Sequence, residues 1–212
     1  MAQRSVDPPA CPDLSFEQAL WSAGVKLVAG IDEAGRGPLA GPVAAAAVIL
    51  PDDLQVVDQL HGVRDSKQLT PKNRQSARQR IIDYALTWGV GFASSQEIDE
   101  LGILPATHLA AKRALEQLRI APEHLLLDCL FLRETALPQT SLIKGDRRSL
   151  SIAAASVLAK TARDALMLAL DAQYPGYGLA KHKGYGTLAH RQAIRSLGPS
   201  PIHRQSFALF GK

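Results

Sequence analysis

The feature that most constrains this chain is an apolar run that ends in two adjacent carboxylates and a glycine–arginine–glycine turn. It spans residues 28–38 and reads Val-Ala-Gly-Ile-Asp-Glu-Ala-Gly-Arg-Gly-Pro. The apolar residues predict a buried strand, and Asp32 and Glu33 supply the oxygen ligands that Mg²⁺ and Mn²⁺ prefer. Glycines on both sides of Arg36 let backbone N–H groups approach an anion, and the arginine adds a planar charged fork. This combination favours a divalent-metal site beside a sugar–phosphate backbone over a strand that simply ends in a charged turn.

The two acids are consecutive, so on a regular strand Asp32 and Glu33 would face opposite sides. We therefore expect the strand to end at Asp32 and Gly35 to turn the chain, so that both carboxylates reach one site. Two carboxylates about 4 Å apart repel by roughly 4 kcal/mol at an effective dielectric near 20. Several carboxylates at one site therefore require bound cations to offset their repulsion. A pair of Mg²⁺ ions about 3.5–4 Å apart would neutralise them and support cleavage of a phosphodiester.

Length and composition predict a single domain over residues 1–212, with a loose N-terminal segment at 1–24. The longest apolar stretch, 43–50, is far shorter than the roughly 20 residues that cross a bilayer, so we expect no membrane association. The first residues lack the apolar core of a secretion signal. Cys11 and Cys129 match neither a disulfide framework nor a zinc spacing, which favours free thiols and a cytoplasmic location.

Charge is distributed unevenly, although the formal net charge is only +4. Residues 144–212 carry 11 Lys and Arg against 3 Asp and Glu, whereas the preceding 143 residues carry 13 basic and 17 acidic groups. A basic C-terminal third beside an acid-bearing N-terminal part suits a polyanion laid across metal-binding carboxylates. A merely basic surface would show the same asymmetry, so charge alone leaves both alternatives open.

Hydrophobic patterning predicts strands that alternate with helices. The strands are expected at 26–32, 43–50, 88–93 and 125–128, and the helices at 70–86, 105–118, 149–172 and 187–197. Thr70 and Pro71 supply a cap and a first-turn proline for the first of these helices. The first two strands form a hairpin and the later ones alternate with helices, which predicts an α/β fold with a mixed central sheet flanked by helices.

Three further acids are candidate ligands. Asp128 ends a short apolar strand, where a carboxylate either binds a cation or caps a turn. Asp146 precedes the long helix and has basic neighbours. Asp164 lies four residues after Lys160, the spacing of an ordinary ion pair on a helix surface. Periodicity alone does not choose between Asp146 and Asp164.

Several motifs together resemble bacterial ribonuclease HII, a type 2 ribonuclease H, with matching order and spacing over residues 28–207. They are Asp-Glu-Ala-Gly-Arg-Gly at 32–37, Asp-Ser-Lys at 65–67, Lys-Gly-Asp at 144–146, the segment 151–160 with Arg163 and Asp164, and His-Lys-Gly-Tyr at 182–185. The resemblance implies a ribonuclease H-like fold, with a helical, substrate-binding C-terminal extension at about 173–212. It also implies a metal-dependent endonuclease that hydrolyses the RNA strand of RNA–DNA hybrids and cuts at single ribonucleotides in duplex DNA, as in ribonucleotide excision repair. Such an enzyme leaves 5′-phosphate and 3′-hydroxyl ends and uses Mg²⁺ or Mn²⁺, with two ions per site during turnover.

Carried over by position, the resemblance implies a catalytic, metal-binding set and a substrate-binding set. The first set is Asp32, Glu33, Asp128 and Asp146, and the second is Gly35, Arg36 and Gly37, which would read the ribose 2′-hydroxyl, and Tyr185, which would pack on the sugar at the RNA-to-DNA junction. Both recognition roles are physically sensible, because only the 2′-hydroxyl distinguishes RNA from DNA at one nucleotide. One residue departs from the family pattern: Cys129 stands where a glycine usually follows the third acid, and its bulk could displace Asp128 or change metal preference.

Charge predicts phosphate contacts from Lys181, His182 and Lys183, with Arg147, Arg148 and Arg204 as further candidates. For Arg147 and Arg148 taken singly, a solvated surface charge is the favoured interpretation. The segment 205–210 has a faint likeness to a sliding-clamp tail, but the family uses Ser-Phe here for its own fold, so we expect no clamp contact. We expect a monomer whose partners are RNA–DNA hybrid and ribonucleotide-containing duplex DNA.

Two other classes of function would fit part of the pattern. One is a metal-dependent nuclease of similar architecture that ignores the ribose, such as a junction resolvase, and the other is a hybrid-binding protein without catalysis. A dinucleotide enzyme is set aside, because the G-x-G-x-x-A match at 184–189 follows no clear strand.

Overall fold

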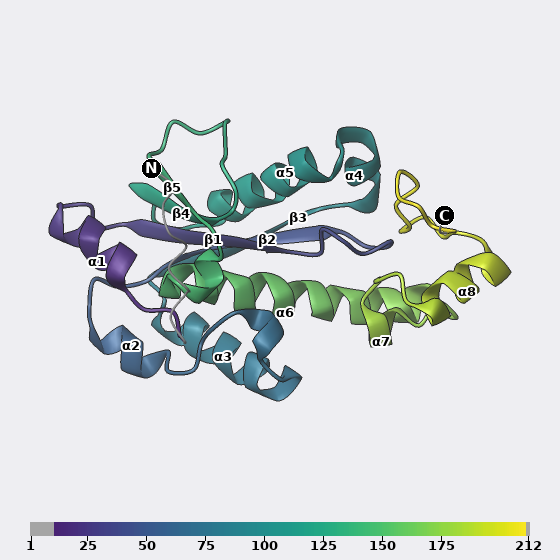
Figure 1. The fold of residues 1–212 in the computed structure, drawn as a ribbon, viewed down its shortest axis with the longest axis horizontal. Coiled ribbons are helices and arrows are strands. Elements are labelled where there is room, and N and C mark those ends of the chain that lie inside the picture. Colours follow the sequence, from purple (N-terminus) through teal and green to yellow (C-terminus); the bar gives the residue numbers. More distant parts are fainter. Residues whose placement is uncertain (1–10, 211–212) are drawn as a thin grey trace, which may run out of the picture. The chain divides into compact units, whose positions relative to one another are not determined.

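The computed structural model describes residues 11–210, which form an α/β fold around a five-stranded sheet (Figure 1). The strands are β1 (Val28–Ala34), β2 (Val43–Ile49), β3 (Thr87–Ala93), β4 (His124–Asp128) and β5 (Gln139–Leu142). The helices are α1 (Ser15–Ser22), α2 (Gln55–Gln59), α3 (Pro71–Tyr84), α4 (Ser95–Leu101), α5 (Ile103–Glu116), α6 (Leu150–Gln173), α7 (Leu179–His182) and α8 (Leu188–Leu197), with 3-10 turns η1 (Ser66–Gln68) and η2 (Gly145–Arg147). The strand order is β3-β2-β1-β4-β5, and the mixed sheet predicted from the sequence is confirmed.

The described chain divides into two compact units. The first contains residues 11–32, 47–88 and 119–157, and the second contains 33–46, 89–118 and 158–210. Four of the five boundaries fall within β1, β2, β3 and α6, so each of these elements contributes residues to both units, and the fifth lies between α5 and β4.

In the first unit, β4 lies between β1 and β5 and runs parallel to both. Ile31 of β1 is paired with Leu127 of β4, so the next residues along the two strands are Asp32 and Asp128. Gly30 allows α6 to approach β1 closely, because a Cβ at this position would overlap the backbone of Ser151. Parallel pairing therefore places two predicted acids at the same edge of the sheet.

The predicted strand 26–32 differs from β1 at its end. β1 continues through Ala34, so Asp32 and Glu33 both lie inside the strand rather than at its last turn. The expectation that the strand ends at Asp32 is therefore wrong. Gly35, the first residue beyond β1, has a φ of 98° and does turn the chain, as predicted.

Part of the segment predicted to be loose is a helix. α1 buries Glu17 and Trp21, and Glu17 Oε1 accepts hydrogen bonds from Ser149 Oγ and Ser151 Oγ, each at 2.6 Å. The proline-rich beginning of the predicted loose segment, residues 1–10, lies outside the described residues. The helix was not expected because its burying partners are more than 130 positions away in the sequence.

In the second unit, α4 and α5 form a helical pair, as Figure 1 shows. Ser94 begins α4 with a capping box completed by Glu97. Gly102 has a φ of 85° and separates the two helices, so α5 begins at Ile103 rather than at 105 as predicted. The predicted start at 105 is wrong because a first-turn proline tolerates two helical residues before it.

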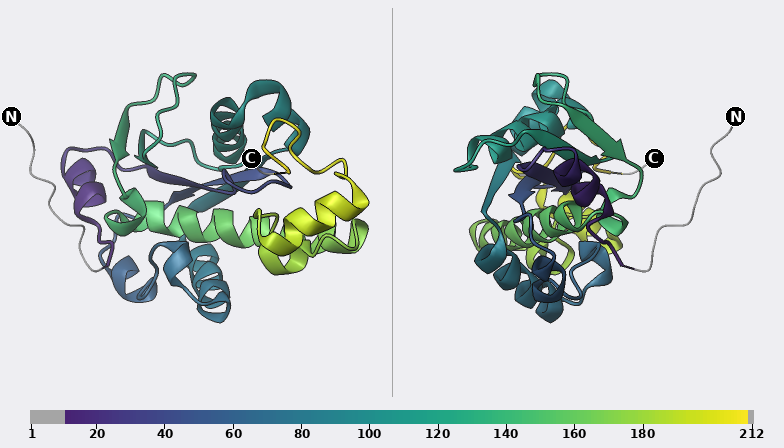
Figure 2. Two further views of the ribbon diagram at one scale, coloured as in Figure 1. Left: turned by 45° about the vertical axis from the view of Figure 1, so that its right-hand side comes forward. Right: turned by 90° about the vertical axis from the view of Figure 1, so that its left-hand side faces the viewer.

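The C-terminal part of the second unit is helical, as predicted for residues from about 173. Buried residues of α7, α8 and the following segment share a small core with Leu39, Met167 and Tyr177. Asp99 of α4 accepts hydrogen bonds from the backbone N–H groups of Gln205 and Ser206, so the last described segment runs along α4 (Figure 2). No helix in the described part of the chain has the length and apolar character required to cross a membrane.

Candidate active site

Three of the predicted carboxylates converge in the first unit. Asp32 of β1, Asp128 of β4 and Asp146 of η2 each offer an oxygen, and these oxygens lie within 4.8 Å of one another. Asp32 and Asp146 are each only 6% exposed. Gly145 N–H donates a 2.7 Å hydrogen bond to Asp128 Oδ1, which fixes β4 to the turn that carries Asp146.

The electrostatics of this acidic cluster, defined as Asp32, Asp128 and Asp146, favour a bound cation. Burial raises the pKa of Asp146 to about 6, and the nearby charges of Asp128 and Asp65 raise it further, against the effect of Lys67 and Arg147. Burial is also the main cause of the raised pKa of Asp128. Three hard oxygen donors, two of them with raised pKa values, fit a divalent cation such as Mg²⁺ or Mn²⁺.

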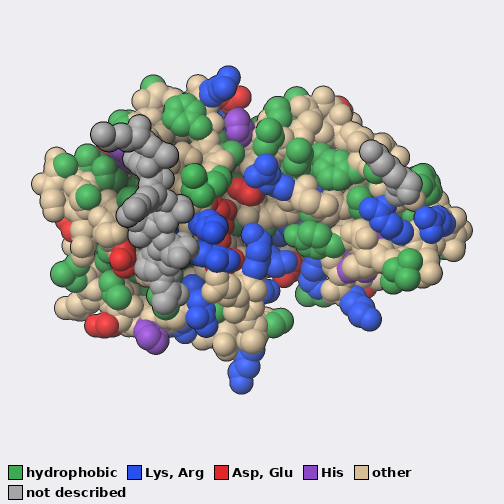
Figure 3. Space-filling view, in the orientation of Figure 1, with side chains coloured by type: hydrophobic (Ala, Val, Ile, Leu, Met, Phe, Trp, Pro, Cys, Tyr) green, Lys and Arg blue, Asp and Glu red, His purple; other side chains and the backbone are tan. Residues whose placement is uncertain are grey.

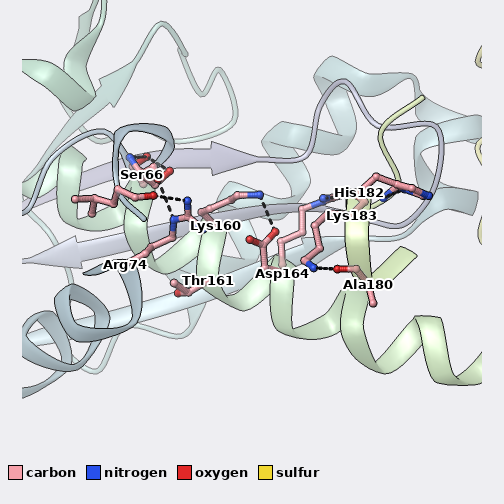
Figure 4. A network of polar contacts seen from close by, with 12 residues as sticks. Ser66, Arg74, Lys160, Thr161, Asp164, Ala180, His182 and Lys183 are labelled. Carbon is pink, nitrogen blue, oxygen red and sulfur yellow. Dashed lines mark hydrogen bonds and ion pairs between the residues drawn. The ribbon is translucent and has the colours of Figure 1, made fainter. Parts of the chain in front are cut away.

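The structure distinguishes the two candidates for the last acid. Asp164 Oδ1 accepts a 2.7 Å hydrogen bond from Lys160 Nζ on the same face of α6, as Figure 4 shows. This is the ordinary helix ion pair that the spacing allowed. Asp146, by contrast, lies in the acidic cluster.

Glu33 occupies a different environment. Its Oε1 lies 3.5 Å from Arg36 Nη1, and within the described part of the chain it is not a member of the acidic cluster. The pair is consistent with the opposite facing of consecutive strand residues, since β1 is still regular at this point.

An ion pair between an acidic and a basic side chain lies next to the acidic cluster within the first unit. Asp65 is 4% exposed, caps η1 by accepting from Lys67 N–H at 3.0 Å, and pairs with Arg147 Nη2 at 3.3 Å. η1 is held in turn by Arg74, whose Nε donates to Ser66 O (Figure 4). Sequence reasoning noted Asp65 and Lys67 only as part of a motif; a short polar cap offers no local signal that it will lie near other acids.

The glycine–arginine–glycine turn of the second unit is organised by a buried arginine. Arg204 is 0% exposed, and its guanidinium donates to Gly35 O at 2.6 Å, Arg36 O at 2.9 Å and Gly41 O at 3.0 Å. All of its donor nitrogens are therefore engaged with the backbone. Our expectation that Arg204 contacts phosphate is wrong, because the side chain lies beneath the turn.

A second buried arginine supports the other side of the same turn. Arg163 of α6 donates to Pro42 O at 2.8 Å, Ala40 O at 3.1 Å and Lys183 O at 3.0 Å. A Cβ at Gly35 would overlap this guanidinium, so the turn requires glycine there for space as well as for its φ. Burial lowers the pKa of both arginines, that of Arg204 to about 9. Sequence reasoning missed this role, because an arginine in a helix usually faces solvent.

Tyr185 is 43% exposed and its ring lies near Gly37, with Cε1 3.9 Å from the point where a Cβ would stand. The structure thus brings together two members of the predicted substrate-binding set. Gly184 before it has a φ of 82° and packs against Ala40 O so closely that a Cβ would overlap it. The tyrosine is therefore presented from a rigid turn.

The predicted phosphate contacts next to Tyr185 are not equivalent. Lys181 is exposed, and Lys and Arg side chains gather at the surface around α7 and α8 in Figure 3. Lys183 Nζ donates to Ala180 O (Figure 4). His182 uses both ring nitrogens within the chain, toward Tyr177 O and Gly184 N, which argues against its predicted contact with phosphate.

Cys129 adopts an unusual backbone conformation beside Asp128. Its φ is 48°, in the left-handed region that favours glycine, and its N–H donates to Leu142 O at 3.0 Å. The departure noted in the sequence therefore falls at a position where glycine would be unstrained.

Comparison with known proteins agrees with this geometry. The family model of ribonuclease HII matches residues 29–210. The chain belongs to the ribonuclease HII family. It is 55% identical over 203 residues to the ribonuclease HII of Synechococcus sp. (strain JA-3-3Ab), covering 96% of this chain and 91% of the relative. It is 54% identical over 194 residues to that of Syntrophotalea carbinolica (strain DSM 2380 / NBRC 103641 / GraBd1), covering 92% and 91%.

Solved structures confirm the predicted ribonuclease H-like fold. Ribonuclease H2 from Pyrococcus horikoshii OT3 superposes with a TM-score of 0.71 at 27% identity, covering 86% of this chain and 94% of that one. Ribonuclease HII from Archaeoglobus fulgidus, solved in complex with PCNA, gives a TM-score of 0.72 at 27% identity and covers 88% and 97%. Bst-RNase HIII, solved with Mn²⁺, shares the fold at a TM-score of 0.66 and 18% identity, covering 99% of this chain and 76% of that one.

Family membership decides among the classes of function left open by the sequence. This ribonuclease HII chain is a ribonuclease H enzyme, a divalent-metal-dependent endonuclease that acts on the RNA strand of RNA–DNA hybrids. A nuclease indifferent to ribose and a binding protein without catalysis are thereby disfavoured.

Proposed function

We propose that this enzyme also cuts duplex DNA at single embedded ribonucleotides and leaves 5′-phosphate and 3′-hydroxyl ends. The observation that carries the proposal is the acidic cluster, three carboxylates on separate elements within 4.8 Å of one another. In this proposal Asp32, Asp128 and Asp146 would hold the Mg²⁺ or Mn²⁺ ions, two of them during turnover, and Glu33 is proposed as a further ligand. The ions would supply an activated water and stabilisation of the leaving oxygen.

The chain's own residues prepare the acidic cluster for that chemistry. The hydrogen bond from Gly145 N–H orients the Asp128 carboxylate toward the acidic cluster and restricts its rotation. Lys67 and Arg147 place positive charge near the acids, which limits their repulsion before ions arrive and offers phosphate contacts once substrate is bound. Asp32 and Asp146 are buried away from bulk water, so their interaction with a cation is stronger than it would be in water.

Ribose recognition is assigned in this proposal to Gly35, Arg36 and Gly37, with Tyr185 at the following sugar. Arg204 holds the carbonyl groups of Gly35 and Arg36 inward, and the Arg163 guanidinium packs against Gly35, so the backbone of the turn stays in one conformation. A fixed peptide group can bond a 2′-hydroxyl without first being ordered, which favours RNA over DNA at that position. Exposed Lys181 and the ammonium of Lys183 are proposed to contact the phosphate backbone.

The decisive assay uses three duplexes of one sequence: all DNA, DNA with one ribonucleotide, and a continuous RNA–DNA hybrid. We expect cleavage of the last two with Mg²⁺ or Mn²⁺, none in EDTA, and product ends that a ligase can rejoin without prior treatment by a kinase or a phosphatase. Asp32→Asn should abolish turnover while hybrid binding survives. Equal cutting of the all-DNA duplex would contradict the proposed recognition of ribose, and near-normal rates for Asp32→Asn would remove Asp32 from the metal site.

We propose that the enzyme acts as a cytoplasmic monomer, without a sliding-clamp tail. Within the second unit, Leu209 is 4% exposed and Ser206 Oγ donates to Asp99 Oδ1 at 2.6 Å, so the segment resembling a clamp tail is engaged with its own fold. Light scattering at working concentration tests the monomer, and a binding assay with a bacterial sliding clamp tests the tail.

A further inference from the structure

Three histidines of the second unit form a buried network that the proposed catalysis does not use. His190 is 0% exposed and His203 is 1% exposed, and their Nε2 atoms lie 3.1 Å apart. His190 Nδ1 lies 2.9 Å from Tyr185 O, and His203 Nδ1 lies 2.9 Å from Ser200 N. The ring of His182 stacks on that of His190 with centroids 4.3 Å apart. Every ring nitrogen of the two buried histidines therefore has a polar partner.

The partners determine which nitrogen carries each proton. A backbone N–H can only donate, so His203 Nδ1 must accept from Ser200 and its neutral ring carries the proton on Nε2. That proton can only be donated to His190 Nε2, which must then accept. His190 is left with its proton on Nδ1, where it donates to the carbonyl of Tyr185. The result is a one-directional relay from Ser200 through two histidines of opposite tautomer to Tyr185.

The same rule, that a backbone N–H can only donate, determines the tautomer of the third histidine ring. Gly184 N–H lies 3.2 Å from His182 Nδ1, so His182 accepts there and donates through Nε2 to Tyr177 O at 2.8 Å. The backbone on both sides of Tyr185 is thus held by neutral imidazoles. Burial lowers the pKa of His203 and lowers that of His190 to about 4, which keeps both rings of the relay uncharged near neutrality.

His203 also lies next to the residue that organises the glycine–arginine–glycine turn. Arg204 donates to Gly35 O and Arg36 O, while His203 reaches Tyr185 through His190. Gly41 N–H donates to Ile202 O and Arg204 N–H to Leu39 O, so this segment is paired with the far end of the turn. Two consecutive side chains therefore connect the two proposed ribose-recognition features.

We propose that His203 is a positioning residue for Tyr185, acting through His190, and that this relay sets how sharply the enzyme selects an RNA-to-DNA junction. The inference rests on the proposed role of Tyr185. It assigns to two buried histidines a specificity function rather than proton transfer in the reaction. Removal of the relay frees the Tyr185 carbonyl from one of its two donors, the other being Thr187 N–H at 2.8 Å.

The tautomers provide a test that does not depend on activity. The full-length enzyme, labelled with ¹⁵N in its histidine rings, is studied by long-range proton–nitrogen correlation at pH 7. We expect His203 and His182 with the proton on Nε2, and His190 with it on Nδ1. A His190 protonated on Nε2, or a doubly protonated ring in the relay, would overturn the proposal.

The functional test uses two exchanges of one side chain. His203→Gln keeps a donor directed at His190, whereas His203→Asn keeps an acceptor for Ser200 but does not reach His190. We measure kcat/KM on the single-ribonucleotide duplex and on the continuous hybrid, and compare their ratio. We expect the ratio to fall roughly five-fold in His203→Asn, the effect of about one net hydrogen bond, and to be retained in His203→Gln.

Two further variants distinguish a failure of the relay from a failure of the proposed role of Tyr185. His61→Asn, at an exposed position in the first unit, controls for the exchange itself and should leave the ratio unchanged. If Tyr185→Ala does not change the ratio, the proposed role of Tyr185 fails. If Tyr185→Ala lowers the ratio while both His203 variants keep the wild-type value, the relay is wrong and the role of Tyr185 stands.

Discussion

Arg204 Nη2 donates a 2.6 Å hydrogen bond to the carbonyl oxygen of Gly35, across 169 positions of the sequence. The same guanidinium reaches the carbonyls of Arg36 and Gly41, and the side chain is fully buried. A buried charge is tolerated where its donors are satisfied, and here backbone dipoles rather than a carboxylate satisfy them. The conformation of the turn therefore depends on a residue remote from it in the chain.

Arg204→Lys tests this dependence. A lysine ammonium cannot reproduce the planar fork that spans three carbonyls, so at least one buried acceptor loses its partner. We expect the free energy of unfolding to fall by about 1–3 kcal/mol and kcat/KM on the single-ribonucleotide duplex to fall roughly ten-fold. Urea denaturation and cleavage kinetics measure the two effects. Arg195→Lys, at an exposed position on α8, is the matched control, and equal losses in both variants would contradict a special role for Arg204.

Asp146 predicts how pH and metal affect stability together. The pKa of Asp146 in the folded protein is raised from 3.8 to about 6. In the metal-free protein its contribution to the free energy of unfolding is therefore favourable below pH 4 and is lost as the pH rises through 6. A cation bound to the ionised acids restores that loss. We therefore expect Mn²⁺ to raise the Tm more at pH 8 than at pH 5, as followed by calorimetry. In Asp146→Asn the rise in Tm caused by Mn²⁺ should be similar at the two pH values. If the rise in the wild type does not depend on pH, Asp146 lies outside the metal site.

Cys129 predicts a stabilising substitution. A non-glycine residue at a φ of 48° carries strain of about 1–2 kcal/mol, and its thiol makes a 3.6 Å contact with Leu142 O and a hydrogen bond to Asp128. Cys129→Gly should therefore raise the free energy of unfolding. The net gain is about 1 kcal/mol, because the greater freedom of glycine in the unfolded chain offsets part of the relieved strain. Thermal unfolding measures the change. Cys11→Gly, at the other free and exposed cysteine, is the control, and a lower Tm in Cys129→Gly would show that the strain is absent.

Asp32 and Asp128 could be identified from the sequence as acids that follow apolar runs, but their convergence depends on β1 and β4 being parallel neighbours, which the local pattern did not indicate. The local pattern did not decide between Asp146 and Asp164, since each acid fits its own surroundings; the structure places Asp146 in the acidic cluster and pairs Asp164 with Lys160. Strand β5 was missed because it is short and polar. The roles of Arg163 and Arg204 were missed because their partners are backbone carbonyls of a distant loop. Neither composition nor residue spacing indicates such partners.

Glu17 of α1 anchors the beginning of α6, the helix that follows the turn bearing Asp146. Its Oε1 accepts from Ser149 Oγ, Ser151 Oγ and Ser151 N, whereas Oε2 is buried without a partner among the described residues. Burial raises its pKa above 4.5. The favourable contribution of protonated Glu17 is therefore complete at low pH and is lost as pH rises through 4.5 and the raised folded value.

Two variants of Glu17 separate its charge from its hydrogen bonds. Glu17→Gln keeps an acceptor for the serines and removes a buried charge, so its stability at pH 8 should equal or exceed that of the wild type and vary less between pH 4 and pH 8. Glu17→Ala leaves the serines without their acceptor and should lose about 2–3 kcal/mol. Because Ser149, which donates to Glu17, lies three residues beyond Asp146, we also expect Glu17→Ala, but not Glu17→Gln, to need more Mn²⁺ for half-maximal cleavage. Identical Mn²⁺ requirements in all three proteins would confine Glu17 to folding stability and separate it from the arrangement of the acidic cluster.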